Sequence, residues 1–404
     1  MTTSDTLQHT TPYSDATPDR LPVGRLLAFT VAGFLAIMTE NMPAGLLPQI
    51  GAGLGVSEAM AGQTVTLYAL GSVVAAIPVI AATRSWSRRP LFLLAIAGLL
   101  AFNTVTAISV HYNLTLVARF IAGMAAGVIW GLVAGYARRL APVHLQGRAL
   151  AIVGVGQPVA LSLGVPLGAW LGGLGDWQVV FWIMSAIALL LIFWVRSSVP
   201  NFPGQAKEQR LPVNKVFTIP GVRPILLVLF AWILAHNIIY TYIAPFLIAT
   251  ETGLRIDVAL LVFGFASVVG IWGTGLMVDR YLRTATLISL AFFGIVAILL
   301  ANAQESSTLI LIGIAIWGLT FGGAPTLLQT ALADAAGEHA DVAQSILVTV
   351  FNLAVAGGGF LGGLVVDNAG ARSLPWVLLP LIAVGLIAAW QSRDYGFRIG
   401  RRGS

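Results

Sequence analysis

Long apolar runs separated by short polar segments are the main pattern along the chain. A helix of about twenty apolar residues crosses a bilayer core of ~30 Å, and helices satisfy their own backbone hydrogen bonds in lipid. Such runs are predicted at 25–47, 60–82, 90–110, 114–136, 149–172, 177–196, 222–247, 257–278, 284–302, 308–330, 342–366 and 374–391. The pattern therefore predicts an all-α membrane protein with twelve transmembrane helices and both termini on one side.

The predicted spans form two groups of six. The longest polar stretch between spans, about 197–221, contains four prolines and reads as a linker. We expect the following division: a disordered tail over 1–23, a six-helix bundle over 24–197, a linker over 198–221, a second bundle over 222–393 and a tail over 394–404. The ends of spans one and seven carry a weak repeat, Pro43-Ala44-Gly45 and Ala244-Pro245-Phe246. Duplicated halves are typical of transporters that bind substrate between them.

Composition and charge support a membrane protein and give its orientation. Hydrophobic residues make up 57% of the chain and charged residues 9%, whereas soluble domains carry about 25% charged residues. Of the 22 lysines and arginines, only Arg255 and Arg372 lie between spans on the side opposite the termini, and Arg119 lies inside a span. The positive-inside rule then predicts that both termini lie in the cytoplasm. We expect the protein to lie in the cell inner membrane.

The residues that several other classes of function require are missing from the sequence. The net charge of +6 follows the membrane topology, so no soluble basic face for nucleic acid is expected. The chain has no cysteine, no histidine pair at metal-ligand spacing and no phosphate-binding loop. We therefore expect no metal, no cofactor and no enzymatic activity.

Glu40 in span one and Arg119 in span four are the two ionisable acids and bases that the predicted spans bury. A charge at mid-membrane costs about 2.5–3.5 kcal/mol even on lenient scales, so it needs a partner or a wet cavity. Both residues lie roughly 8–10 Å below the outer surface, at ~1.5 Å per residue. We expect Glu40 to take up and release a proton and Arg119 to tune that exchange. A structural ion pair that never titrates is the alternative.

Polar side chains in other spans are candidates for a central substrate cavity. His236 and Tyr240 lie one helical turn apart and share a face. For His236, three roles stay open: titration, cavity lining and hydrogen bonding between helices. The predicted substrate-binding residues are Asn41, Tyr68, Gln157, His236, Asn237, Tyr240 and Asn352.

Glycines recur at helical spacing in spans four, five and eleven. Gly164 and Gly168 lie in span five together with Pro158 and Pro166. Small residues allow close approach of helices in lipid, either as static packing or as a seam along which helices slide. The two prolines favour a kink in this span.

Several stretches together resemble the major facilitator superfamily, in its twelve-span drug:proton antiporter group. They include Thr39-Glu40-Asn41-Met42-Pro43, Thr66-Leu67-Tyr68-Ala69-Leu70-Gly71 and Gly164-Val165-Pro166-Leu167-Gly168. Within that group, the chain is most similar to bacterial sugar and purine-nucleoside efflux permeases. The resemblance implies two pseudo-symmetric six-helix bundles, Glu40 as the proton site and export as the direction.

The resemblance also implies a conformational loop signature in each half. In the second half it stands as Gly275, Asp279 and Arg280. In the first half Arg84 and Arg88 stand without the acidic residue, so the usual latch between an acid and a helix end is incomplete there.

These observations lead to one expected function and three rivals. We expect a monomeric exporter that exchanges a small organic solute for protons by alternating access, with the substrate, protons and membrane lipid as its partners. The first rival takes up a neutral solute by a proton-independent or symport route. The second is a sensor or scaffold, although every loop is short, and the third is a membrane enzyme.

Overall fold

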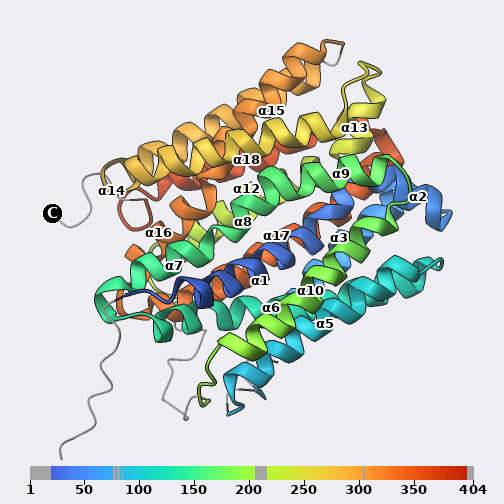
Figure 1. Ribbon diagram of the computed structural model, residues 1–404. Coiled ribbons are helices and arrows are strands. Elements are labelled where there is room, and N and C mark those ends of the chain that lie inside the picture. Colours follow the sequence, from blue (N-terminus) through green and yellow to red (C-terminus); the bar gives the residue numbers. More distant parts are fainter. Residues whose placement is uncertain are drawn as a thin grey trace, which may run out of the picture.

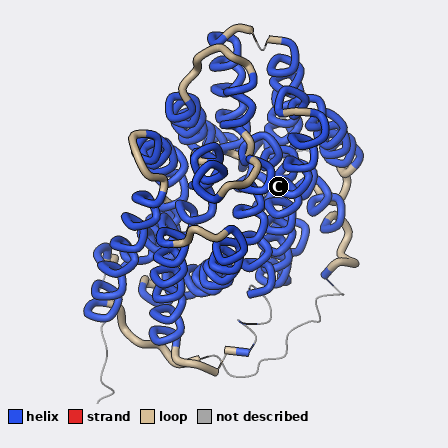
Figure 2. Tube along the Cα trace, turned by 90° about the vertical axis from the view of Figure 1, so that its right-hand side faces the viewer, coloured by secondary structure: helices blue, strands red, loops and turns tan. Residues whose placement is uncertain are grey.

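The computed structural model describes residues 20–75, 79, 82–83, 85–204, 216–303 and 305–397. Within these ranges the regular elements are helices, and no strand is present (Figures 1 and 2). The first half contains α1 (Val23–Asn41), η1 (Met42–Gly45), α2 (Leu47–Leu54), α3 (Glu58–Val74), α5 (Arg88–Ile108), α6 (Tyr112–Leu140), η3 (Val143–Leu145), α7 (Gln146–Gly154), α8 (Gly156–Val159), η4 (Ala160–Gly164), α9 (Val165–Gly173) and α10 (Gln178–Ser198). The second half contains α12 (Val222–Thr241), α13 (Ile243–Ala249), α14 (Ile256–Asn302), α15 (Ser307–Gly322), α16 (Ala324–Ala336), η5 (Gly337–His339), α17 (Ala340–Ala369), η6 (Ala371–Ser373) and α18 (Leu374–Gln391).

The helices correspond to the predicted spans. Ten stretches are long and apolar enough to cross a membrane. One of them, α14, covers two predicted spans, which meet at Tyr281 with a non-helical φ of −132° and ψ of 30°. The span predicted at 60–82 begins with α3, and part of its continuation lies outside the described residues. The arrangement is consistent with twelve crossings in two six-helix bundles.

Prolines interrupt the corresponding spans of the two halves in similar places. The first span ends its α-helix at Asn41, and Pro43 follows within η1. The seventh span ends its α-helix at Thr241, and Pro245 follows within α13. Because proline lacks an N–H and its ring clashes with the preceding turn, a regular helix does not continue through it. The two helix breaks therefore lie at the positions where the sequences of spans one and seven resemble each other.

The helices run side by side, so the molecule has two ends (Figure 1). We call the end with α2 and α13 the far end and the opposite end, with Arg20 and Phe397, the termini end. The halves pack along α3 and α17, and along α14 with η4 and α9.

Contacts across the two halves gather toward the far end and the middle. Gln63 reaches the carbonyl of Gly359, and a Cβ added to Gly45 would lie 3.2 Å from Leu260. Nearer the middle, Gly264 lies against the backbone of Ser162. The described residues of the termini end show no comparable packing between the halves. The structure is therefore closed at the far end.

Candidate functional site

Glu40 lies at the end of α1, next to the break made by η1. Its side chain is 7% exposed, and within the described residues its carboxylate has no hydrogen-bond or ion-pair partner. The carboxylate interacts electrostatically with Arg119 and Tyr68 of the first half, and with Tyr240 of α12 in the second. Glu40 is thus an acid at the junction of the halves, with its oxygens uncommitted.

Arg119 is buried completely within the first half. Its Nε donates to the carbonyl of Thr64 in α3 at 3.2 Å, and its Nη2 donates to the carbonyl of Glu40 at 3.4 Å. The guanidinium carbon lies 4.7 Å from the centre of the Tyr68 ring, a cation–π distance. Its Nη1 is buried and has no hydrogen-bond partner in the described part of the chain. Arg119 therefore joins three helices and keeps one donor free.

Arg119 contacts Glu40 through the main chain, and the structure contains no side-chain ion pair between these two described residues. The carbonyls at the C-terminal end of a helix lack intrahelical partners and carry partial negative charge. Because α1 ends at Asn41, the guanidinium binds that end, through the carbonyl of Glu40. The structure brings the two residues together, with the carboxylate and Nη1 both unpaired.

Tyr68 holds the same region of the first half. Its hydroxyl donates to the carbonyl of Ala36 at 2.9 Å, and its side chain is buried. A Cβ on Gly123 would collide with the carbonyl of Tyr68, and one on Gly71 with the carbonyl of Phe120. One glycine from each helix thus lets α6 pack directly onto α3, which places Arg119 and Tyr68 next to α1.

His236 and Tyr240 belong to a buried aromatic cluster in the second half. The indole Nε1 of Trp317 donates to Nδ1 of His236 at 3.2 Å, so of the three predicted roles this structure contains the bond between helices. The ring of Phe321 stacks on His236 at 3.3 Å between centroids, and Tyr240 lies at 5.1 Å. The Tyr240 hydroxyl is buried without a hydrogen-bond partner among the described residues. These rings pack against one another, and the Tyr240 hydroxyl remains without a hydrogen bond beside them.

The three asparagines predicted for the cavity share one contact pattern. Each donates from its side-chain nitrogen to the carbonyl four residues earlier: Asn41 to Ile37 at 3.1 Å, Asn237 to Ile233 at 2.9 Å and Asn352 to Val348 at 2.9 Å. This bond within one helix leaves each amide oxygen as an acceptor. Gln157 is half-buried in α8, and the structure gives it no direct link to Glu40.

The sequence did not indicate several residues that shape this site. Phe263 and Phe321 complete the aromatic cluster around His236. Phe321 follows Trp317 by one helical turn, so a shared face could have indicated it. Thr64 contributes only its carbonyl to Arg119, and no side-chain pattern marks such an acceptor.

The predicted conformational residues of span five pack α9 onto the first span. Gly164 lies against Met38, and Gly168 lies against Met42. Pro166 stands in the first turn of α9, directly after the π-helical segment η4. The span is therefore interrupted in the region between its two prolines, as their positions predict.

The described residues of the loop signatures lie at the termini end. Arg84 lies outside the described residues, whereas Arg88 begins α5 and donates its backbone N–H to the carbonyl of Phe202 at 2.8 Å. Asp279 and Arg280 are exposed near the kink of α14, and a Cβ on Gly275 would meet nothing within 4 Å.

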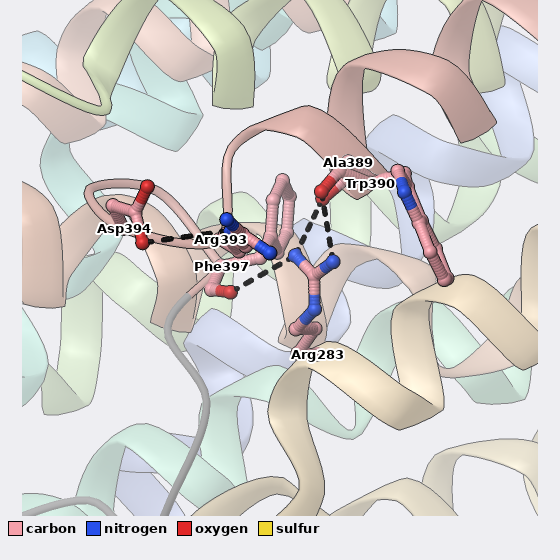
Figure 3. Close-up of polar contacts among 6 residues, drawn as sticks. All are labelled: Arg283, Ala389, Trp390, Arg393, Asp394 and Phe397. Atoms are coloured by element: carbon pink, nitrogen blue, oxygen red, sulfur yellow. Dashed lines mark hydrogen bonds and ion pairs between the residues drawn. The ribbon is translucent and has the colours of Figure 1, made fainter.

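Arg283 fastens the kink of α14 to the end of α18, as Figure 3 shows. Its guanidinium donates to the carbonyls of Ala389 at 2.9 Å, Trp390 at 2.8 Å and Phe397 at 3.3 Å. Carbonyls at a helix C-terminus attract a cation. This contact holds the last described residues against the second half.

Comparison with known proteins agrees with this architecture. The sequence profile of the Major Facilitator Superfamily matches residues 29–356 and 258–400, two overlapping segments that cover most of the chain. The chain belongs to the major facilitator superfamily. It is therefore a multi-pass membrane transporter, and neither the family nor the relatives are enzymes.

Relatives and solved structures of this superfamily resemble the chain over most of its length. The purine ribonucleoside efflux pump NepI of Escherichia coli O157:H7 is 31% identical over 351 residues, 86% of this chain and 88% of that protein. The NepI protein of Shigella sonnei (strain Ss046) is 30% identical over the same shares.

Two solved structures share the fold. A D-xylose-proton symporter has a TM-score of 0.74 at 15% identity and covers 92% of this chain and 96% of its own. The human organic anion transporter MFSD10 (TETRAN) has a TM-score of 0.68 at 16% identity, with 92% and 100% covered.

Proposed function

We propose that the protein exports a small organic solute in exchange for protons, by alternating access of the junction between its halves. The observation that carries this proposal is the uncommitted carboxylate of Glu40. It lies beside a buried guanidinium in the first half and interacts with Tyr240 in the second. A group that can change its charge at this junction can couple a proton to the relative position of the halves.

The free donor of Arg119 suggests how the coupling works. A buried donor left without a partner costs about 1–3 kcal/mol, so Nη1 is a ready partner for an ionised carboxylate. We infer that Glu40 pairs with Nη1 when it has released its proton, and turns toward Tyr240 and the substrate when it is protonated. Protonation would then change which half Glu40 is bound to.

The orientation follows from the charge distribution of the loops. Among the residues that the structure describes, the arginines other than Arg119, Arg255 and Arg372 lie at the termini end, so we place this end in the cytoplasm and the protein in the cell inner membrane. The far end would face the periplasm. In that orientation the far end would be closed toward the periplasm, as in the state that loads a substrate for export.

The proposed substrate is a neutral molecule with a planar ring, such as a purine ribonucleoside. The similarity to NepI proteins supports this class. The packing supports it as well, because aromatic rings from α12, α14 and α15 gather in one cluster, and α12 also carries the neutral amide of Asn237. Arg119, the cation of this region, is fully buried, which disfavours an anionic substrate.

Export in cells that lack their own nucleoside and drug pumps tests the function. Wild type should lower intracellular radiolabelled inosine and raise resistance to toxic purine nucleosides, and Glu40→Gln should lose uphill export by roughly tenfold or more. Glu58→Gln is the matched control, since this half-buried acid begins α3 at the far end. Equal export by wild type and Glu40→Gln at every pH would refute the coupling.

Uptake of a neutral solute is the rival that the same assay separates. An importer would raise intracellular label, and a proton-independent carrier would ignore a protonophore. Export that collapses when the protonophore is added supports antiport.

A further inference from the structure

Tyr242 occupies the break between α12 and α13, in the span that corresponds to the one carrying Glu40. Its φ of −106° and ψ of 26° are not helical. Pro245 lies three residues later and removes the N–H that would have bonded to Thr241 in a continuous helix. The break turns the side chain of Tyr242 toward α3 and α17, where it is completely buried.

The phenol of Tyr242 lies between main-chain carbonyls of the two halves. Its oxygen is 2.7 Å from the carbonyl of Gly359 in α17 and 3.2 Å from the carbonyl of Ala59 in α3. Each of these carbonyls has a second lone pair besides the one used in its own helix. One hydroxyl of the second half therefore contacts the first half directly.

Gln63 makes the reciprocal contact from the first half. Its Nε2 lies 3.2 Å from the carbonyl of Ala59 and 3.4 Å from the carbonyl of Gly359. Two side chains, one from each half, thus share the same pair of carbonyls. We call this group of Tyr242, Gln63, Ala59 and Gly359 the far-end latch.

The glycines around the latch show that its fit is close. A Cβ on Gly363 would lie 2.7 Å from the Tyr242 hydroxyl oxygen and 2.9 Å from Nε2 of Gln63. One on Gly362 would lie 2.6 Å from the Tyr242 ring, and one on Gly62 would collide with its hydroxyl. Side chains larger than hydrogen at these positions would hold the carbonyls out of reach.

We propose that Tyr242, through the far-end latch, is the positioning residue that sets the balance between the closed and open far end during transport. The latch bridges the halves and can exist only while the far end is closed. Opening must break the two contacts that cross between the halves, Tyr242 to Ala59 and Gln63 to Gly359, and expose the phenol and carbonyls to water. This inference rests on the proposed alternating access, and it assigns to Tyr242 a role separate from that of Glu40.

The test measures the opening directly. The chain has no cysteine, so spin labels can be attached at Ala52→Cys in α2 and Asn368→Cys at the end of α17, both exposed at the far end and in different halves. Double electron–electron resonance in nanodiscs then gives the distance distribution. Tyr242→Phe, which keeps the ring, should raise the ratio of long to short distances roughly five- to tenfold, as the loss of one buried hydrogen bond predicts.

Tyr112→Phe is the matched control. Its phenol donates to the carbonyl of Met60 at 2.9 Å, next to Ala59, but both residues belong to the first half. This variant should leave the distribution unchanged. A Tyr242→Phe distribution identical to that of wild type, or an equal shift in Tyr112→Phe, overturns the proposal.

Gln63→Leu provides an independent measurement if Tyr242→Phe does not fold. It should shift the distances in the same direction, and the double variant should shift them by less than the product of the single effects, because the two side chains share their acceptors. A Gln63→Leu distribution like that of wild type overturns the shared latch. The distances need no substrate, so equal export by wild type and Glu40→Gln would refute the proposed coupling and leave the latch standing.

Discussion

At the scale of single residues, the contacts that hold the fully buried Arg119 determine how the site is arranged. Arg119 has carbonyl partners in α1 and α3, and an aromatic face at Tyr68. A planar guanidinium can donate in several directions and stack at the same time, whereas an ammonium is a compact point charge. The geometry of the group, as well as its charge, keeps the three helices in place around Glu40.

This geometry predicts that Arg119→Lys is not conservative. A lysine would keep the positive charge but could not bond both carbonyls and leave a donor for Glu40. We expect at least a tenfold loss of uphill export, with the protein still present in the membrane. Export normalised to the amount of protein measures it.

Arg139→Lys is the control for the substitution itself. Arg139 also donates to a carbonyl, that of Pro203 at 3.1 Å, but lies exposed at the termini end. The Arg139→Lys variant should keep nearly full export. If Arg119→Lys exports as well as wild type, the guanidinium geometry has no part in coupling.

The sequence could indicate these two charges because lipid makes each charge costly, so Glu40 and Arg119 stand out from an apolar background. It could not indicate that Arg119 binds carbonyls of Glu40 and Thr64, since every residue has a carbonyl and only packing selects the acceptor. The partner of His236 was hidden for the same reason, because Trp317 comes from another helix.

At the scale of helices, glycines with the same appearance in the sequence have different surroundings. Gly264 and Gly273 both lie in α14. A Cβ on Gly264 would collide with the backbone of Ser162 in the other half, whereas a Cβ on Gly273 would meet nothing within 4 Å. Of these two glycines, only Gly264 allows the close contact between α14 and η4.

Gly264→Ala should therefore impair transport, because the added methyl group prevents the halves from meeting at this seam. We expect roughly tenfold lower export, with normal insertion in the membrane. Gly273→Ala is the matched control and should export like wild type. Equal export by the two variants would show that close approach at Gly264 is dispensable.

Helix positions were the most predictable feature, since their length and hydrophobicity are fixed by the bilayer. The repeat at Pro43 and Pro245 could be read from the sequence, but the helix breaks there were not predicted, since the expected spans 25–47 and 222–247 run through both prolines. The joining of two predicted spans into α14 was not predicted either, since only the short turn at Tyr281 separates them. Which helices meet across the halves depends on tertiary packing and could not be read from periodicity.

At the scale of the whole molecule, the two halves meet toward one end and carry an ionisable group at their junction. The contacts of α3 with α17 toward the far end and of α14 with η4 nearer the middle hold one conformation. Alternating access requires a second conformation with those contacts broken. The proton on Glu40 is the proposed control between them, and substrate binding is the event that exchanges it.

The most direct test measures proton movement with purified protein in liposomes. A pH dye outside the vesicles reports protons while an outward gradient of purine nucleoside drives transport. Wild type should move protons inward as substrate leaves, whereas Glu40→Gln should still exchange substrate between equal concentrations but move no protons. Proton movement by Glu40→Gln equal to that of wild type would contradict the account.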